Sequence, residues 1–474
     1  MTHKDAPAGR RPSPDEARRN VERLVQRNRQ SCDAILRAAH RPPVVSVGIV
    51  GAGMMGRAIA AASLAGGIRI VLHDAESSER EDAPGRIFAE LITAIGLPSP
   101  EADALVDHQL DVAASLDAVA ACPLTIESVP ESAAAKRRVF ADLEPLLTDD
   151  AVLATNTSTI PVDQLAAGLR RPERFCGIHF FHPVAQRPLV EVVRGTKTSP
   201  ATVAAAVGYA RSIDKMALPV GDGPGFIVNR LLLPYLTEAV ELLLDGASIE
   251  RVESVATAFG MAKGPLELLD EIGLDTAIAG GRVLWEAFPR RLVVSPLMIA
   301  MYKAGRFGVK SGAGFFNHAA VASKTRKAVP EPGDSRASSP PKTDGAGETS
   351  STRTPATRGR PPVDPVALEK TAQWARTPLA LADDDVLDRL LLPMVLEATR
   401  LLDEGRAADP RDIDLGVLFG LGFPASQGGL LFWADAQGQA DLMARLSRLA
   451  SLGPRAEPTA LLREMTAAGR RFYE

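Results

Sequence analysis

The sequence between residues 44 and 74 constrains the fold most strongly, because it combines a strand, a glycine turn and a helix. A β-branched run, Val44–Val50, leads directly into the pattern Gly51-x-Gly53-x-x-Gly56, and residues of helical composition follow it. Gly51 permits the tight turn, Gly53 lets backbone N–H groups approach a pyrophosphate at the helix N-terminus, and Gly56 lets helix and strand pack closely. This order of elements is typical of a dinucleotide-binding unit.

Asp74 ends the second expected strand and discriminates between the two nicotinamide dinucleotides. It lies 23 positions after Gly51, where a carboxylate can accept hydrogen bonds from both ribose hydroxyls and would repel a 2′-phosphate. A glycine pattern by itself also occurs in ordinary turns, but the strand before it, the helix after it and the acid at this distance favour a cofactor site. The sequence therefore predicts NAD rather than NADP.

The composition of the 474 residues is that of a soluble globular protein with several domains. An apolar fraction of 46% is sufficient for sizeable cores, and a net charge of −4 gives no reason to expect nucleic acid or an acidic membrane surface as the main partner. No run resembles a signal peptide or a membrane span. Three scattered cysteines, Cys32, Cys122 and Cys176, predict reduced thiols, no metal site and a cytoplasmic location.

Changes of pattern along the chain divide it into five segments. Ser13-Pro14-Asp15-Glu16 has the form of a helix capping box, so one amphipathic helix is expected at the start. Alternating short strands and helices then indicate a mostly parallel, doubly wound sheet, and long apolar helices follow. The expected segments are an N-terminal helical extension (1–41), an NAD-binding domain (42–196), a first helical domain (197–318), a flexible linker rich in Ser, Thr, Pro and Gly (319–364) and a second copy of the helical domain (365–474).

The hydrophobic periodicity also places the individual elements. Beyond the first two strands, the sequence predicts strands at 110–112, 124–126, 151–154, 175–181 and 189–193. It predicts a helical pair within 76–107 and further helices at 133–147, 226–245, 249–259 and 266–284.

An internal repeat links the two helical segments. Asn229-Arg230-Leu231-Leu232-Leu233-Pro234 is echoed by Asp388-Arg389-Leu390-Leu391-Leu392-Pro393, at a constant offset of 159 (388 − 229). The second copy keeps the apolar framework but has an acid in place of the amide Asn229. This difference is expected if the framework serves packing in both copies and the amide serves chemistry in one.

A histidine and a glutamate come together if two neighbouring strands form a hairpin. His179 lies in the run Cys176–Pro183, and Glu191 lies in the run Pro188–Val193. In a hairpin centred on Ala185 the two residues face each other across the strands, since 179 + 191 equals 2 × 185. A carboxylate beside an imidazole fixes its tautomer and raises its basicity, as a general base requires. A structural histidine with an unrelated surface glutamate stays open as the alternative.

Two polar residues near the expected sheet edge are further candidates for the site. Ser158 follows a buried-strand pattern, so it falls at the carboxyl end of a strand, where ligands bind in such sheets. Asn229 opens an otherwise apolar helix. Ser158 as a turn or capping residue and Asn229 as the start of a turn stay open as alternatives.

Taken together, these motifs resemble the L-3-hydroxyacyl-CoA dehydrogenase family over residues 44 to 317. With its second helical copy, the chain resembles the dehydrogenase half of the bacterial multifunctional fatty-acid oxidation proteins, and we expect no hydratase half. The motifs that carry the resemblance are Gly51–Gly56, Val129-Pro130-Glu131 with Lys136, Asn156-Thr157-Ser158, Gly177-Ile178-His179-Phe180-Phe181 with Pro183, Leu189–Val193, and Gly223–Arg230.

The resemblance implies a Rossmann-type doubly wound sheet followed by two related all-helical domains. It implies NAD-dependent oxidation of an L-3-hydroxyacyl-CoA to the 3-oxoacyl-CoA in fatty-acid β-oxidation. In that reaction His179 is the base, Glu191 orients it, and the substrate oxygen is held by Ser158 and Asn229. The resemblance also places around the cofactor, besides the three glycines, Met55, Asp74, Glu131 and Lys136.

Three features depart from the family pattern. His182 stands where the family usually has Asn, Pro130 removes a backbone N–H beside the expected nicotinamide ribose, and residues 76–107 contain no Lys but several acids. Two alternative functions therefore stay open. One is an NAD-dependent dehydrogenase of the same fold acting on another hydroxy acid or thioester, and the other is a non-catalytic NAD-binding subunit. A homodimer and association with hydratase or thiolase subunits both stay open as the assembly.

Overall fold

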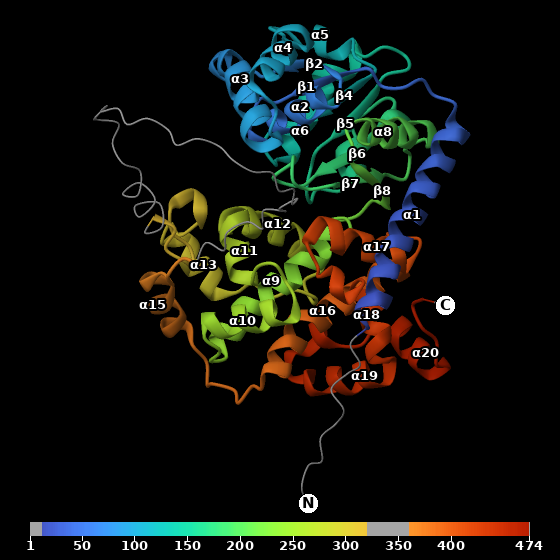
Figure 1. Ribbon diagram of the computed structural model, residues 1–474. Helices are drawn as coiled ribbons and strands as arrows, with labels where there is room; N and C mark the ends of the chain where they lie inside the picture. The colour runs from blue at the N-terminus through green and yellow to red at the C-terminus, as the bar shows by residue number, and fades with distance from the viewer. Residues whose placement is uncertain (1–11, 320–359, 474) are drawn as a thin grey trace, which may run out of the picture.

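The structure is a computed structural model, and it describes residues 12–319 and 360–473. A sheet flanked by helices forms the upper half of the molecule in Figure 1, and helices alone form the lower half. Two apolar clusters lie on opposite faces of the sheet, one shared with α2 and α8 and the other with α5, α6 and the helical half. The carboxyl end of the strand at 152–155 lies close to the helical half, since the side-chain amide of Asn229 donates to the carbonyl of Ser158 just beyond that strand.

The sheet has eight strands in the order β3-β2-β1-β4-β5-β6-β7-β8. Neighbouring strands are parallel, except for β6 and β7, which form an antiparallel pair. The central strands are buried on both faces, which explains their unbroken apolar sequences. The strands are β1 (Ser46–Val50), β2 (Arg69–His73), β3 (Leu110–Val112), β4 (Leu124–Glu127), β5 (Val152–Thr155), β6 (Phe175–Phe180), β7 (Leu189–Arg194) and β8 (Met216–Gly221).

Apart from α1, which precedes the first strand, the helices around the sheet connect its strands, and those of the lower half pack on one another. The first set comprises α1 (Pro14–Ala39), α2 (Met54–Ala65), α3 (Ser77–Glu90), α4 (Ser99–Gln109), α5 (Leu116–Ala120), α6 (Ala133–Leu143), α7 (Val162–Ala166) and α8 (Pro200–Ser212). The second set comprises α9 (Val228–Leu244), α10 (Ile249–Phe259), α11 (Pro265–Ile272), α12 (Leu274–Ala287), α13 (Pro296–Lys303), α15 (Pro365–Trp374), α16 (Asp383–Asp403), α17 (Pro410–Gly416), α18 (Leu430–Gln437), α19 (Gln439–Arg448) and α20 (Ala460–Ala468).

Strand β8 extends the sheet beyond the boundary expected at residue 196. Its six residues pair in parallel with β7, so the sheet ends at Gly221. The sequence pattern did not reveal this strand because Pro219 interrupts it. Proline is tolerated there because β8 pairs on one side only, so an N–H is not needed on its outer edge.

Two further expectations differ from the structure in the helical half. The single helix expected over 266–284 is broken at Gly273, whose φ of 91° ends α11 and begins α12. Most of the expected flexible linker, 320–359, lies outside the described residues. Its last residues are held in place, because the N–H of Asn317 donates to the carbonyl of Pro362 (2.8 Å) and the N–H of Asp364 donates to that of Phe315 (2.9 Å).

Helix α1 joins the sheet to the last helical segment. The expected capping box is present, since the Ser13 hydroxyl and the Glu16 carboxylate accept hydrogen bonds from each other's backbone N–H groups. Along the helix, the side-chain amide of Asn20 donates to the carbonyl of Gly428 (2.8 Å), and that of Asn28 donates to the carbonyl of Ala217 in β8 (2.9 Å). Helix α1 therefore runs along one side of both halves (Figure 1).

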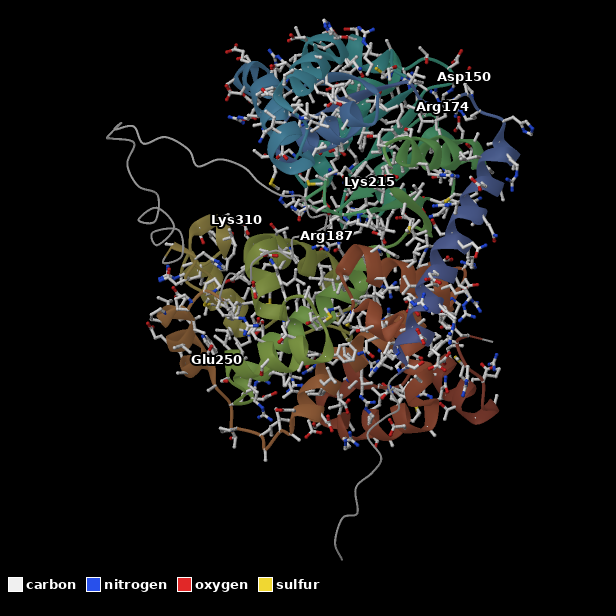
Figure 2. All side chains as sticks on the ribbon, viewed as in Figure 1. Asp150, Arg174, Arg187, Lys215, Glu250 and Lys310 are labelled. Carbon is white, nitrogen blue, oxygen red and sulfur yellow. The ribbon has the colours of Figure 1, made fainter. Side chains whose placement is uncertain are left out.

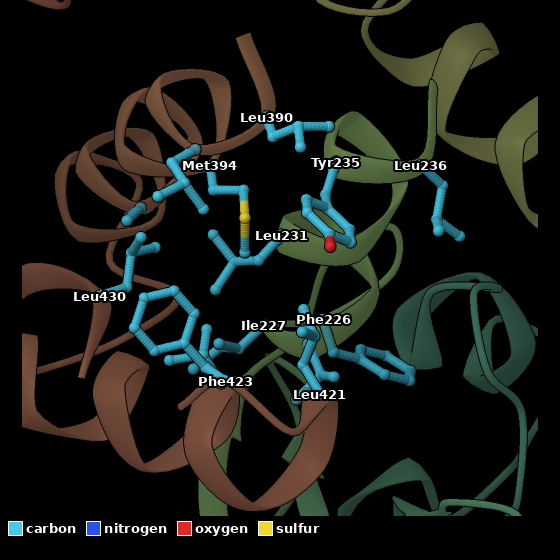
Figure 3. Packing of buried hydrophobic residues seen from close by; sticks show 14 of the residues in the cluster. Phe226, Ile227, Leu231, Tyr235, Leu236, Leu390, Met394, Leu421, Phe423 and Leu430 are labelled. Carbon is cyan, nitrogen blue, oxygen red and sulfur yellow. The ribbon is translucent and has the colours of Figure 1, made fainter. Parts of the chain in front are cut away.

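The repeat found in the sequence corresponds to two helices packed against each other, α9 and α16. Leu231 and Tyr235 of α9 meet Leu390 and Met394 of α16 in a buried cluster (Figure 3). Leu231 and Leu390 are equivalent positions of the two copies, at the offset of 159. Each copy therefore buries the apolar face of the other, which a single copy would leave exposed to water.

Buried carboxylates also recur in the two copies. Glu253 of α10 accepts a hydrogen bond from the N–H of Leu266 at the start of α11 (2.8 Å). Asp414 of α17 accepts one from the N–H of Leu431 at the start of α18 (2.7 Å). Each carboxylate accepts a hydrogen bond from an N–H group that has no partner within its own helix. Each also lies at the positive end of the helix dipole, where a negative charge is stabilised. The two copies thus share this type of hydrogen bond as well as their sequence pattern.

Candidate active site

The glycine turn after β1 has two closely packed positions and one open position. A Cβ at Gly51, where φ is 110°, would lie 2.6 Å from the carbonyl oxygen of Ser128, and a Cβ at Gly56 would lie 1.8 Å from that of Gly51. Gly53 precedes the first turn of α2, and a Cβ there would meet no atom within 4 Å. The open space at the N-terminus of α2 therefore fits the pyrophosphate of a dinucleotide.

Asp74 lies beside this turn, at the carboxyl end of β2. One carboxylate oxygen accepts the N–H of Ala52 (2.7 Å), and the other accepts the N–H of Glu76 (3.0 Å). Arg57, the nearby cation in α2, donates to Glu79 (3.1 Å) and to the carbonyl of Ala52 (2.5 Å). The position of Asp74 suits hydrogen bonds from the ribose hydroxyls. The ion pair with Glu79 compensates the positive charge of Arg57, which could otherwise attract a 2′-phosphate. Met55 is half-buried in the first turn of α2.

The amino group of Lys136 lies between two carboxylates. Its side chain is 1% exposed, and its Nζ lies 2.8 Å from Oε1 of Glu127, at the end of β4, and 3.4 Å from Oε2 of Glu131. Burial raises the pKa of Glu127 although Lys136 opposes this rise. Glu127 is not among the residues predicted from the sequence, although an acid at the end of an otherwise apolar strand is a signal for it. Lys136 thus lies beneath Glu131 rather than beside open space.

Glu131 holds the loop that follows β5. Its Oε1 accepts hydrogen bonds from the Thr157 hydroxyl (2.7 Å) and from the N–H groups of Ser158 (2.9 Å) and Thr159 (3.1 Å). Burial would raise the pKa of Glu131, but the charge of Lys136 and these hydrogen bonds outweigh burial and lower it. The ionised carboxylate therefore fixes the position of Ser158 at the sheet edge.

His179 and Glu191 face each other in the hairpin of β6 and β7, as the sequence analysis predicted. The His179 Nδ1 lies 2.7 Å from Oε2 of Glu191, and both side chains are buried. The other oxygen of Glu191 accepts the N–H groups of Ile227 (3.0 Å) and Val228 (3.1 Å) at the start of α9. An Nδ1–H that donates to the carboxylate leaves Nε2 as the basic nitrogen.

Asn229 and Ser158 are brought together by the same start of α9. The Asn229 side-chain amide donates to the backbone carbonyl of Ser158 (2.9 Å). The N–H of Gly225, in the turn before α9, donates to the carbonyl of Thr159 (3.2 Å). The loop after β5, the hairpin and the start of α9 are thus one hydrogen-bonded unit, and it unites the four residues proposed from the sequence.

The side chain of Lys215 holds the loop between β6 and β7 through hydrogen bonds to its backbone. The Nζ of Lys215 donates to the carbonyls of Val184 (2.6 Å) and Arg187 (3.0 Å). Figure 2 shows Lys215 and Arg187 at the junction of the sheet with the helical half. His182, which departs from the family pattern, lies exposed in this loop. Its exposure places it at the rim of the site rather than in the hydrogen-bonded unit.

Two family profiles match the chain. The 3-hydroxyacyl-CoA dehydrogenase NAD binding domain matches residues 46–223, and the C-terminal domain of the same family matches residues 225–318. This chain belongs to the 3-hydroxyacyl-CoA dehydrogenase family. The match to the NAD binding domain confirms the predicted cofactor, and the two matches together confirm the predicted Rossmann-type sheet followed by helices.

Individual relatives cover different parts of the chain. The fatty acid oxidation complex subunit alpha of Pseudomonas aeruginosa is 33% identical over 437 residues, which are 90% of this chain and 55% of that protein. FadB2 of M. tuberculosis is 36% identical (TM-score 0.56) and covers 58% of this chain and 99% of its own. The 3-hydroxybutyryl-CoA dehydrogenase of Escherichia coli is 25% identical (TM-score 0.72) and covers 90% and 99%. The chain spans about half the length of the curated relatives it matches.

Within residues 12–319 and 360–473, no helix is both long enough and apolar enough to cross a membrane.

Proposed function

We propose that this dehydrogenase oxidises the 3-hydroxyl of L-3-hydroxyacyl-CoA to the ketone, as a step of fatty-acid β-oxidation. The observation that carries the proposal is the buried contact of 2.7 Å between His179 and Glu191, joined through the start of α9 to Asn229 and Ser158. This arrangement combines a base, a group that orients it and two groups that can bind an oxygen, as alcohol oxidation requires.

The proposed reaction uses these residues as follows. The Nε2 of His179 accepts the hydroxyl proton, and Glu191 stabilises the positive imidazolium while it keeps Nδ1 protonated. Ser158 and Asn229 hold the substrate oxygen, which lies on the carbon that loses hydride. NAD supplies the hydride acceptor when it is bound.

The same proposal assigns the cofactor-binding residues. Gly51, Gly53 and Gly56 with Met55 contact the pyrophosphate side, and Asp74 binds the adenosine ribose. Glu131 lies at the nicotinamide side, and Lys136 acts there through its ion pair with Glu131. The open space at Gly53 and the ends of β1, β2 and β4 support this placement.

We also propose a division of the chain that follows the structure. The NAD-binding unit extends from about 42 to the end of β8, the first helical unit follows to 318, and the second begins at 365, with 1–41 as the helical extension. The Pseudomonas relative is named as a subunit of a fatty acid oxidation complex. We therefore propose that this chain associates with hydratase or thiolase subunits. Its three cysteines are buried and unpaired, which supports a cytoplasmic location.

The proposed substrate is tested by following NADH formation with 3-hydroxyacyl-CoA thioesters of increasing chain length. Free 3-hydroxy acids and the D-isomers serve as controls. Turnover of the L-thioesters alone supports the proposal. Turnover of free acids alone would replace it with the alternative of another hydroxy acid.

A further inference from the structure

Arg230 follows the site residue Asn229 in α9, yet its side chain points to the second helical copy. The guanidinium is completely buried, and it donates to Glu397 from Nε (2.8 Å) and to Glu404 from Nη1 (2.6 Å), both in or next to α16. It also lies over the ring of Phe288, 4.6 Å from the centroid. We call Arg230, Glu397 and Glu404 the proximal clamp.

The equivalent residues of the other copy form a second clamp in the same interface. At the offset of 159, Arg389 corresponds to Arg230, Glu238 to Glu397 and Asp245 to Glu404. The Arg389 guanidinium donates to Glu238 (2.8 Å) and to Asp245 (2.5 Å), and it is buried too. We call Arg389, Glu238 and Asp245 the distal clamp. The two clamps share the buried arginine and its pair of acids, while their outer acids differ: Glu404 is 25% exposed and also binds Arg291, and Asp245 is 7% exposed and also binds Arg376.

The residues that precede the two arginines distinguish the clamps. Asn229 precedes Arg230 and donates to Ser158, and the preceding turn gives two N–H groups to Glu191. Asp388 precedes Arg389, and it accepts hydrogen bonds from Arg445 (2.8 Å) and Arg448 (3.0 Å) instead. One clamp is therefore continuous with the candidate site, and the other is continuous with an ion pair in the helical half.

The backbone of Arg230 extends this continuity to a second site loop. Its N–H donates to the carbonyl of Gly225 (3.2 Å), and the N–H of Gly225 donates to the carbonyl of Thr159 (3.2 Å), next to Ser158. A shift of Arg230 would move both the start of α9 and this loop. The carboxylates that hold Arg230 belong to the second copy, and none of the candidate site residues lies in its described part, 365–473.

We propose that Glu397 and Glu404 are positioning residues of the dehydrogenase reaction, which act through Arg230 on Asn229 and Glu191. This inference rests on the proposed function for its kinetic readout. The second helical copy thus orients the site in addition to covering the first copy. Hydrogen bonds and charges from Arg230 and Arg291 outweigh burial and lower the pKa of Glu404, so it is charged at neutral pH.

The two clamps allow a direct test with Glu404→Gln and its control Asp245→Asn. Each substitution removes one negative charge that pairs with a buried arginine at an equivalent position, and each keeps an oxygen acceptor. We expect Glu404→Gln to lower kcat about tenfold or more, since small displacements of reacting groups have effects up to about a hundredfold. The KM for NAD should stay unchanged, because the glycine turn is remote. Asp245→Asn should lower the thermal midpoint similarly but keep kcat within about twofold.

A second pair and a second readout make the result decisive. Glu397→Gln and its control Glu238→Gln should repeat the contrast in kcat. Hydrogen–deuterium exchange of the peptide around 225–232 should be faster in Glu404→Gln and Glu397→Gln than in either control, whether or not a substrate is known. Equal kcat losses and equal exchange in both clamps would overturn the positioning role. A wild-type protein inactive on every thioester, with the contrast in exchange retained, would overturn the proposed substrate alone.

Discussion

Glu131 and Glu191 work in the same way at the residue scale. Each uses one carboxylate oxygen to collect backbone N–H groups from a loop that carries an oxygen-binding candidate, Ser158 or Asn229. A charged acceptor with several donors forms stronger hydrogen bonds than neutral groups do. The two carboxylates therefore fix the site before any substrate arrives, which is the preorganisation that catalysis needs.

Replacement of His179 by Gln tests the base. Glutamine can form a hydrogen bond to Glu191 but cannot accept the hydroxyl proton, so kcat should fall by roughly 10²–10⁴-fold. NADH binding, measured by fluorescence titration, should be retained because the glycine turn is untouched. Near-normal kcat in a folded His179→Gln protein would remove the proposed mechanism and favour the non-catalytic alternative.

Replacement of Asp74 by Asn tests the choice of cofactor. The wild-type protein should show a much larger kcat/KM with NAD than with NADP, because the carboxylate repels a 2′-phosphate. In Asp74→Asn this difference should shrink, since the charge is removed while the side chain keeps its size. Steady-state kinetics with both cofactors provide the measurement. Comparable kcat/KM values in the wild-type protein would show that Asp74 does not select the cofactor.

The contact between His179 and Glu191 could be predicted from the sequence because a hairpin sets its own register. The partners of Glu131 could not, since they lie in the following βα loop, 26 to 28 positions away. Their contact depends on how two loops approach at the sheet edge, and no local pattern records this. The placement of Lys136 at the cofactor follows from the family resemblance and stays a prediction, and no local pattern records that its Nζ is enclosed by Glu127 and Glu131.

At the scale of elements, the local signals were sufficient where one segment determines its own structure. The capping box of α1, the glycine turn before α2 and the apolar strands β4 to β7 all follow from nearby residues. Strand β8 and the break at Gly273 are different, because β8 exists only by pairing with β7. In the sequence, Gly273 is one small residue within an apolar helical pattern, and only its positive φ shows that the helix ends there.

The repeated carboxylates predict how stability depends on pH. Burial raises the pKa of both Asp414 and Glu253 to about 7, above the ordinary values of 3.8 and 4.5. Such a group stabilises the fold fully below its unfolded pKa, and this contribution disappears as pH rises through about 7. The free energy of unfolding should therefore fall as pH increases from about 5 to about 8.

Asp414→Asn and Glu253→Gln should each flatten this dependence, because an amide does not titrate. Denaturant unfolding across the pH range provides the measurement, with the exposed Asp142→Asn as the control. An unchanged slope in both variants would show that these carboxyls do not titrate near neutral pH.

At the scale of the whole molecule, the second helical copy covers the face of α9 that carries Leu231 and Tyr235. A chain truncated at about residue 362 would expose this face and leave Arg230 without its two carboxylates. We expect the truncated chain to lose stability or to associate with itself, as seen by thermal unfolding and light scattering. An equally stable, fully active monomeric fragment would contradict this expectation.

The contact between α9 and α16 joins two copies of one unit, and a single chain carries both. Between separate chains, such a contact would obey mass action and would dissociate on dilution. Within one chain, the effective concentration of the partner is set by the covalent connection and not by the amount of protein. Specific activity and thermal midpoint should therefore remain constant over a wide dilution series, even where an assembly of separate subunits would fall apart.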